Sequence, residues 1–266
     1  MQFNEFLSEI SLHNEVKEKV LDLVKDNYGI YLNYAKSLND IALSEQTFEE
    51  LVNIYVEDIY NYNILAIYLI SAFIIYDKYK LKGISKKIYI DTMKCFSRFI
   101  DECYIKNGKY YFDRGFWTYR QTNMSLFRIG TLEFEFTHDK KISVHIPSDA
   151  VLTNEEIDKS FNELECFLNE FYPENKDYEI YCSSWLLSPE LSKYLDSKSR
   201  ILLFQKYFEI VDFNPLAMDV FEWVFKTNQN TPICDLKEET SLQKNIKKAL
   251  LNGQKIGIGY GILKKK

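Results

Sequence analysis

Three features that would point to a partner or a compartment are missing from this sequence. Acidic residues outnumber basic ones, 39 to 33, so the formal charge is −6 and nothing favours a nucleic-acid partner. The longest apolar run, residues 64–76, is well short of the roughly 20 residues that a helix needs to cross a bilayer. The first ten residues lack the basic and apolar regions of a signal peptide. We therefore expect a cytoplasmic protein with no nucleic-acid or membrane partner.

Metal-ligand patterns are also missing. The five cysteines form no Cys-x-x-Cys pair and their number is odd, while the three histidines lie far apart in the sequence. These spacings match neither a zinc site nor a disulfide framework. We expect reduced thiols and no metal.

Aromatic residues, in contrast, are abundant: 20 Tyr and 19 Phe contribute most of an aromatic share of 16%. An aromatic-lined cleft would explain them, but dense packing in an ordinary core is the simpler interpretation. The hydrophobic share of 46% and the charged share of 27% are those of a soluble globular protein.

The first hundred residues show helical periodicity. Apolar spacing predicts helices over residues 14–25, 44–60, 64–80 and 85–103, of which the third is apolar on nearly all sides, as in the centre of a bundle. No constellation of chemically active residues appears among them.

The character of the sequence changes at residue 107. Alternating aromatic and β-branched residues predict strands over residues 109–112, 116–121, 126–129, 131–137 and 142–146. We expect a helical domain over residues 1–107 and a second domain over residues 108–266.

The second domain should contain a mixed sheet. Further strands are predicted over residues 178–187, 200–213 and 256–263, and helices over residues 153–171, 215–225 and 240–251. The helix between the strands 142–146 and 178–187 implies one locally parallel pair. The predicted fold class is α+β.

One stretch combines a strand, a loop and a helix start. The strand carries His145 and stops at Pro147, which cannot extend the ladder, and Thr153 with Glu156 has the spacing of a capping box. The helix start has free amide donors and a positive dipole end, so the stretch is a plausible anion cradle.

Five ordered segments, FDRGFWTYRQ, SLFRIGTLEFE, VHIPSDAVL, CSSWLL and ILLFQKYF, resemble the GNAT-like acyltransferase family of two-domain bacterial proteins. The helical half agrees in the run YKLKGISKKIYIDTMKCF. The resemblance implies a helical N-terminal domain, a GNAT-like C-terminal domain, and acyl transfer from acetyl-CoA or another acyl-CoA to an unidentified amine or small-molecule acceptor.

By that resemblance, residues 142–146 and 178–187 are the splayed strands that hold the pantetheine arm, and residues 147–154 are the pyrophosphate turn. The residues implied to bind the coenzyme are Ile146, Pro147, Ser148, Ala150, Val151, Leu152, Thr153 and Trp185.

The turn departs from the superfamily pattern. It lacks the motif (Arg/Gln)-x-x-Gly-x-(Gly/Ala), and Asp149 would repel a pyrophosphate unless it points away. A formal match lies at Gln254, Gly257 and Gly259, where no helix follows, so we interpret those glycines as a strand or bulge feature.

His145 is the candidate general base, because its intrinsic pKa is near neutrality; a structural hydrogen bond is the alternative. Glu133 and Glu135 share one sheet face and are further catalytic candidates if the hairpin register places them near His145. A solvated face is the other interpretation of the two carboxylates. Arg128 is a candidate substrate anchor, or the partner of one of these carboxylates in an ion pair.

Cys182 and Ser184 share one face of their strand. A nucleophilic Cys182–His145 pair is conceivable, against the common case of a buried free cysteine. Gln205, inside an apolar run, either has a buried partner or contacts the substrate.

The sequence therefore predicts an acyltransferase that uses direct attack of the acceptor. A non-catalytic ligand-binding or regulatory protein is the alternative, and a cysteine-dependent hydrolase is a third, weaker interpretation.

Overall fold

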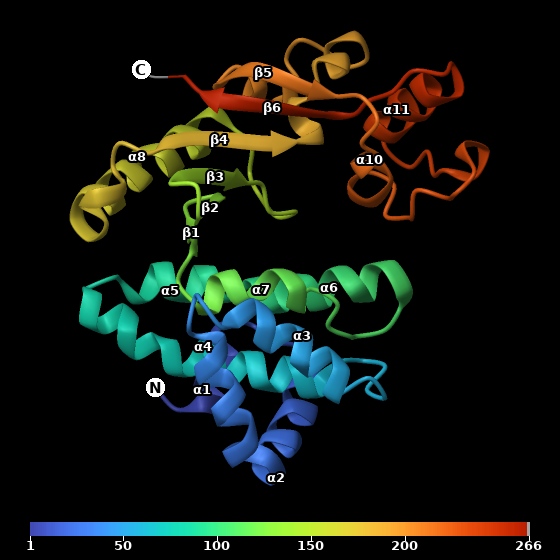
Figure 1. Ribbon diagram of the computed structural model, residues 1–266. Helices are drawn as coiled ribbons and strands as arrows, with labels where there is room; N and C mark the ends of the chain where they lie inside the picture. Colours follow the sequence, from blue (N-terminus) through green and yellow to red (C-terminus); the bar gives the residue numbers. More distant parts are fainter. Residues whose placement is uncertain (265–266) are drawn as a thin grey trace. The chain divides into compact units, whose positions relative to one another are not determined.

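The computed structural model of this protein describes residues 1–264, which form two compact units (Figure 1). Unit 1 comprises Met1–Ile129 with Glu133–Glu135, and unit 2 comprises Gly130–Leu132 with the chain from Phe136 onward. A helical first part and a mixed sheet in the second part confirm the predicted α+β class.

Unit 1 is built from helices around a central apolar one. This central helix, α4, has buried residues on all sides, as predicted, including Leu65, Ile67 and Tyr68. The helices are α1 (Phe3–Glu9), α2 (Asn14–Leu38), α3 (Ser44–Ile54), α4 (Tyr62–Lys82), α5 (Lys86–Met93), α6 (Cys95–Asn107) and α7 (Gly115–Thr122).

The prediction of a strand over residues 116–121 is wrong, because this segment forms α7. The hydroxyl of Tyr68 on α4 donates a 2.7 Å hydrogen bond to the carbonyl of Gly115, and a Cβ at Gly115 would meet the ring of Phe48. Packing against α4 thus overrides the strand preference of the aromatic residues. Residues 109–112 form no strand either.

Two carboxylates of unit 1 are held by arginines. Glu133 Oε1 lies 2.7 Å from Arg98 Nη2, and the two side chains are only 4% and 10% exposed. Glu135 Oε1 lies 2.8 Å from Arg120 Nε, and the Arg120 guanidinium lies over the ring of Trp117. The interpretation of Glu133 as part of a solvated face is therefore wrong, since its carboxylate is buried and paired.

The strands are β1 (Leu126–Ile129), β2 (Leu132–Phe136), β3 (Lys141–His145), β4 (Glu179–Ser184), β5 (Phe208–Asn214) and β6 (Ile258–Leu263), in the sheet order β1-β2-β3-β4-β6-β5. β3 and β4 are parallel, which confirms the predicted pair, and β6 is antiparallel to both β4 and β5. The N–H of Thr137 donates to the carbonyl of Lys141 (3.0 Å) and closes the predicted turn before β3.

Helices of unit 2 connect these strands. They are α8 (Asn154–Phe171), α9 (Arg200–Gln205), α10 (Asp219–Trp223) and α11 (Ser241–Leu251), with short 3₁₀ turns η1 (Pro173–Asn175), η2 (Trp185–Leu187), η3 (Pro189–Lys193) and η4 (Ile233–Asp235). The predicted strand over residues 200–213 is wrong in its first half, which forms α9. That half instead buries Phe204 and packs Ile201 and Leu202 against a neighbouring apolar cluster.

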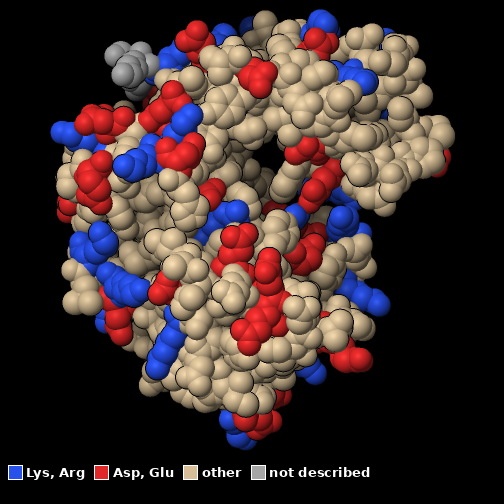
Figure 2. Space-filling model, viewed as in Figure 1, with Lys and Arg blue, Asp and Glu red and all other residues tan. Residues whose placement is uncertain are grey.

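Charged side chains of both signs are interspersed on the face drawn in Figure 2.

No helix within residues 1–264 has the length and apolarity that a membrane span requires.

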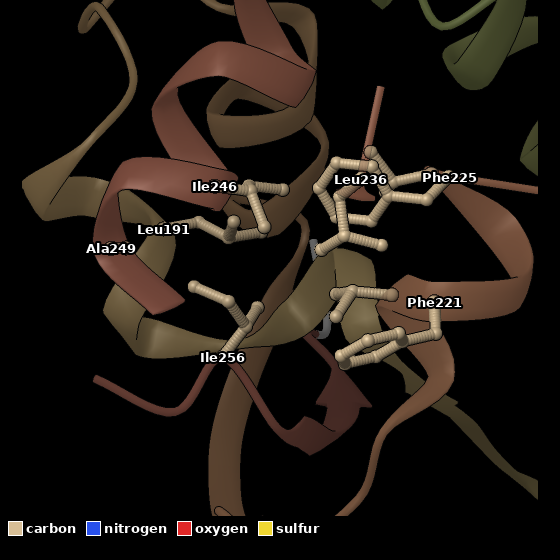
Figure 3. Close-up of a cluster of buried hydrophobic side chains, with 9 residues drawn as sticks. Leu191, Phe221, Phe225, Leu236, Ile246, Ala249 and Ile256 are labelled. Carbon is tan, nitrogen blue, oxygen red and sulfur yellow. The ribbon is translucent and has the colours of Figure 1, made fainter. Parts of the chain in front are cut away.

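The segment between β5 and β6 packs together with η3 around a hydrophobic cluster (Figure 3). Residues from η3, α10 and α11 converge there, so this excursion of the chain is a packed structure and not a loose linker. The buried members are Leu191, Val220, Phe221, Val224, Phe225, Leu236, Ile246, Ala249 and Ile256.

Gly259 lies in β6, in agreement with its interpretation as a strand feature, and Gly257 immediately precedes this strand. Gly257 has φ +65°, a conformation that side chains rarely adopt. Gly259 lies in β6, where a Cβ would clash with the backbone carbonyl of Leu187. The absence of a side chain at Gly259 therefore allows β6 to approach η2 closely.

We expect Arg98→Met to lower the free energy of unfolding of unit 1 by about 3 kcal/mol, because it leaves the Glu133 carboxylate buried without its partner. Urea unfolding followed by far-ultraviolet circular dichroism measures this loss. The double variant Arg98→Met with Glu133→Met should recover most of it. Lys80→Met, which removes an exposed pair with Asp77, should change little, and an equal loss in this control would contradict the prediction.

We expect Gly259→Ala to destabilise unit 2 by about 1–3 kcal/mol, since the added methyl group must displace the backbone of η2. Gly29→Ala is the matched control: it lies within α2 with no atom within 4 Å of the new methyl group. That substitution should stabilise by about 0.5–1 kcal/mol. Thermal unfolding of both variants tests the pair, and a stable Gly259→Ala protein would refute the steric argument.

Candidate active site

The carboxyl ends of β3 and β4 define the candidate site. Their parallel register runs from Lys141↔Glu179 to Ser143↔Tyr181. Beyond it β3 continues to His145, while β4 continues to Ser184 in register with β6. The two strands thus extend past their paired segment at one edge of the sheet, where ligands commonly bind in such folds.

A fixed loop follows β3. The N–H of Ala150 donates to the carbonyl of Pro147 (2.9 Å), and the N–H of Val151 donates to Thr131 Oγ1 (2.6 Å). Thr153 is the N-cap of α8, and its hydroxyl accepts a bond from the N–H of Glu156 (3.4 Å), which confirms the predicted helix start. The loop is therefore held at its middle and at its end.

Ser160 of α8 positions Thr131, the residue that binds this loop. Its hydroxyl accepts from the N–H of Thr131 (2.8 Å) and donates to the carbonyl of Glu156 (2.8 Å). Gly130 has φ +63°, and a Cβ there would clash with Ser160. Gly130, Thr131 and Ser160 are positioning residues that sequence reasoning missed, and the glycine of FRIG is the signal that could have revealed them.

A small pocket lies at the first turn of α8. It has a volume of about 260 Å³ and is lined by Asn154, Leu203, Lys206 and Tyr207. The hydroxyl of Tyr207 donates to the carbonyl of Asn154 (3.3 Å), and Lys206 makes no ion pair within residues 1–264. Sequence reasoning missed this pocket because it took residues 200–213 as one strand.

The electrostatics of the helix start are mixed. Glu155 and Glu156 occupy the first turn of α8, and Asp149 of the preceding loop is exposed. These carboxylates oppose the binding of an anion that the helix dipole would otherwise favour. Lys206, which lines the pocket, is a basic side chain at this end.

The predicted catalytic residues of unit 2 differ in exposure. His145 is half-buried at the end of β3. Cys182 on β4 is fully buried, and burial raises the pKa of its thiol, which disfavours the reactive thiolate. The hydroxyl of Ser184 accepts a bond from the N–H of Leu186 (3.2 Å) and caps η2.

Two further residues that were predicted to bind the coenzyme or the substrate make packing contacts or hydrogen bonds within the protein. Trp185 packs against the apolar cluster of Figure 3. The side-chain amide of Gln205 donates to the carbonyls of Leu186 (2.8 Å) and Ser188 (2.9 Å), so it has the buried partners that the sequence left open.

Arg128, Glu133 and Glu135 belong to unit 1. The N–H of Arg128 donates to Thr92 Oγ1 (2.9 Å), while the two carboxylates bind Arg98 and Arg120. Their joint action with His145 stays a prediction. Across the part of the chain that the structure describes, no group of three or more His, Cys, Asp or Glu side chains is arranged to hold a metal ion.

Solved structures with the same fold are acyltransferases. An acyltransferase in complex with decanoyl-CoA and teicoplanin superposes with a TM-score of 0.80 at 18% identity, over 97% of this chain and 86% of that chain. An acyltransferase with decanoyl-CoA has a TM-score of 0.79 at 17% identity, over 98% and 87% of the two chains. At this identity the likeness establishes the fold. No curated protein gives a significant sequence match.

Two family models cover nearly the whole sequence. The N-acyltransferase N-terminal domain matches residues 1–124, and the GNAT-like C-terminal domain matches residues 126–263. The chain therefore belongs to the family that joins an N-acyltransferase N-terminal domain to a GNAT-like C-terminal domain.

Proposed function

We propose that this protein transfers an acyl group from acyl-CoA to an amine acceptor by direct attack. The observation that carries the proposal is the parallel β3–β4 pair, whose carboxyl ends extend past their pairing beside a fixed loop and a capped helix start. Membership of the N-acyltransferase family and a fold shared with acyltransferases that bind decanoyl-CoA support it.

The acyl-CoA would lie along this edge of the sheet. Its pantetheine arm would run between the ends of β3 and β4, and its phosphates would meet the loop from Ile146 to Thr153. Because Glu155 and Glu156 make the helix start acidic, we assign the phosphate countercharge to Lys206 in the adjoining pocket.

His145 would act as the general base. The acceptor ammonium loses a proton to the imidazole, and its nitrogen then attacks the thioester carbonyl carbon. The tetrahedral intermediate loses a proton from its nitrogen to solvent and collapses with cleavage of the carbon–sulfur bond, and the leaving thiolate takes up the proton held by the imidazolium. The products are an amide and free CoA, with no change of oxidation state.

A covalent route through Cys182 has less support. Its thiol is fully buried and its pKa is raised by that burial, so little thiolate would form. Direct attack needs no such nucleophile.

A second candidate is a non-catalytic protein that keeps the fold and binds another ligand. The acidic first turn of α8 and the absence of the glycine motif from residues 147–152 favour it. Ligand binding and turnover separate the two candidates.

An acyl-CoA at 100 times its dissociation constant should raise the free energy of unfolding by about 2.7 kcal/mol, because it binds only the native state. Thermal shifts with acetyl-, octanoyl- and decanoyl-CoA measure this effect. Lys206→Ala should reduce the shift, whereas Lys198→Ala, an exposed lysine that does not line the pocket, should leave it intact. The absence of any shift at millimolar acyl-CoA would exclude acyl transfer.

His145→Ala should lower turnover at least about 100-fold while leaving the acyl-CoA shift intact, since a general base contributes that much to rate. Cys182→Ala should retain turnover. The release of free CoA thiol in the presence of a panel of primary amines measures both variants. Full activity in His145→Ala would remove His145 as the base, and loss of activity in a folded Cys182→Ala would favour the covalent route.

A further inference from the structure

Unit 1 contains a cavity that is larger than the pocket at the first turn of α8. Its volume is about 620 Å³, within the range of small-molecule pockets. Its lining residues come from three segments whose ribbons are drawn in Figure 1: the first half of α2, the α3–α4 connection with the start of α4, and the α6–α7 connection with the end of α6. All of its lining residues belong to unit 1.

The wall from α2 presents a regular row. Glu15, Lys19 and Leu23 follow one another at intervals of four residues, which places them on one face of the helix. A carboxylate, an ammonium group and an apolar side chain therefore line the cavity in this order along α2.

Hydrogen bonds fix the two connections that form the opposite wall. The N–H of Phe112 donates to the carbonyl of Tyr60 (3.0 Å), and the amide of Asn61 donates to the carbonyl of Phe112 (2.8 Å). The hydroxyl of Tyr62 donates to the carbonyl of Tyr110 (3.1 Å). These bonds join the α3–α4 and α6–α7 connections, so the cavity is preformed.

Stacked aromatic rings line the cavity. Tyr110 stacks on Tyr104, with ring centroids 4.4 Å apart, and on His13, with centroids 4.3 Å apart. His13 does not line the cavity, and the two stacking contacts hold the Tyr110 ring in place. Tyr104 is 47% exposed, and Tyr60 and Tyr62 add two further rings to the wall. Such rings bind flat apolar groups and organic cations.

Most of the charged side chains around the cavity have no ion-pair partner among residues 1–264. Glu15, Glu57, Lys19 and Lys109 line it, and within residues 1–264 none of them forms an ion pair. The Asp58 carboxylate accepts hydrogen bonds from the N–H and the side-chain amide of Asn63, both 2.7 Å. Three carboxylates therefore face two ammonium groups, an excess of one negative charge.

We propose that this cavity binds a small aromatic molecule that carries an ammonium group. The rings hold the aromatic body, and the Glu15 and Glu57 carboxylates attract the ammonium group. Aromatic amines and aromatic amino acids share this chemistry, and Lys19 with Lys109 would favour the amino acid by binding its carboxylate. All of its residues belong to unit 1, so this proposal does not rest on the function proposed for the residues of unit 2.

Isothermal titration of the full-length protein with four matched compounds tests the proposal. Phenethylamine and phenylalanine carry the ammonium group, whereas 3-phenylpropionate and 2-phenylethanol share the ring without it. The first two should bind at least about threefold more tightly than the others, the factor expected of an exposed charge pair. No heat from either ammonium compound at about 10 mM, tenfold above a weak dissociation constant of about 1 mM, would overturn the proposal.

Variants locate the binding. Glu15→Gln with Glu57→Gln should weaken phenethylamine binding about three- to tenfold, and Glu18→Gln, on the same helix but not lining the cavity, should not. If phenylalanine binds more tightly than phenethylamine, and the double variant Lys19→Met with Lys109→Met loses this difference, the site is an amino-acid site. Equal affinity for phenylalanine and phenethylamine would identify an amine site. Unchanged affinity in the double glutamate variant, or equal affinity for 3-phenylpropionate, would refute the proposal.

Discussion

The parallel pairing of β3 with β4 is the constraint on which the organisation of unit 2 depends. Parallel neighbours cannot be joined by a tight turn, so the chain must cross the sheet, and α8 is that crossing. The crossing brings the carboxyl ends of both strands to one edge and starts a helix there. The capped start of α8, the loop anchored by Thr131 and the pocket beside Asn154 all follow from this connection.

The sequence was informative where local chemistry and tertiary packing agree. Pro147 ends β3 and Thr153 caps α8, because each acts through its own backbone or its near neighbours. The parallel pair followed from element order alone. The prediction failed at residues 116–121 and 200–205, where aromatic and apolar residues suit a strand but pack as helices against α4 and the apolar cluster.

The candidate site was predictable in position but not in chemistry. His145 and the loop from Ile146 to Thr153 were found from the stretch itself, whereas Lys206 and Tyr207 come from a segment some fifty residues later that only the fold brings to α8. The pairing of Glu133 with Arg98 was equally hidden, since it joins residues that lie 35 positions apart. Long-range contacts of this kind leave no periodic signal.

The sheet order β4-β6-β5 places the last strand between two earlier ones. β5 pairs only with β6 in this order, so it cannot become part of the sheet before residues 258–263 have been synthesised. During synthesis, the backbone N–H and C=O groups on the outer edge of β4 and along β5 therefore stay unpaired until β6 is made. Strands with unpaired edges tend to pair with other chains. The cluster around Ile246 joins η3, which follows β4, to α10 and α11, which follow β5, so its packing links the chain beyond β4 to the chain beyond β5 independently of the pairing with β6.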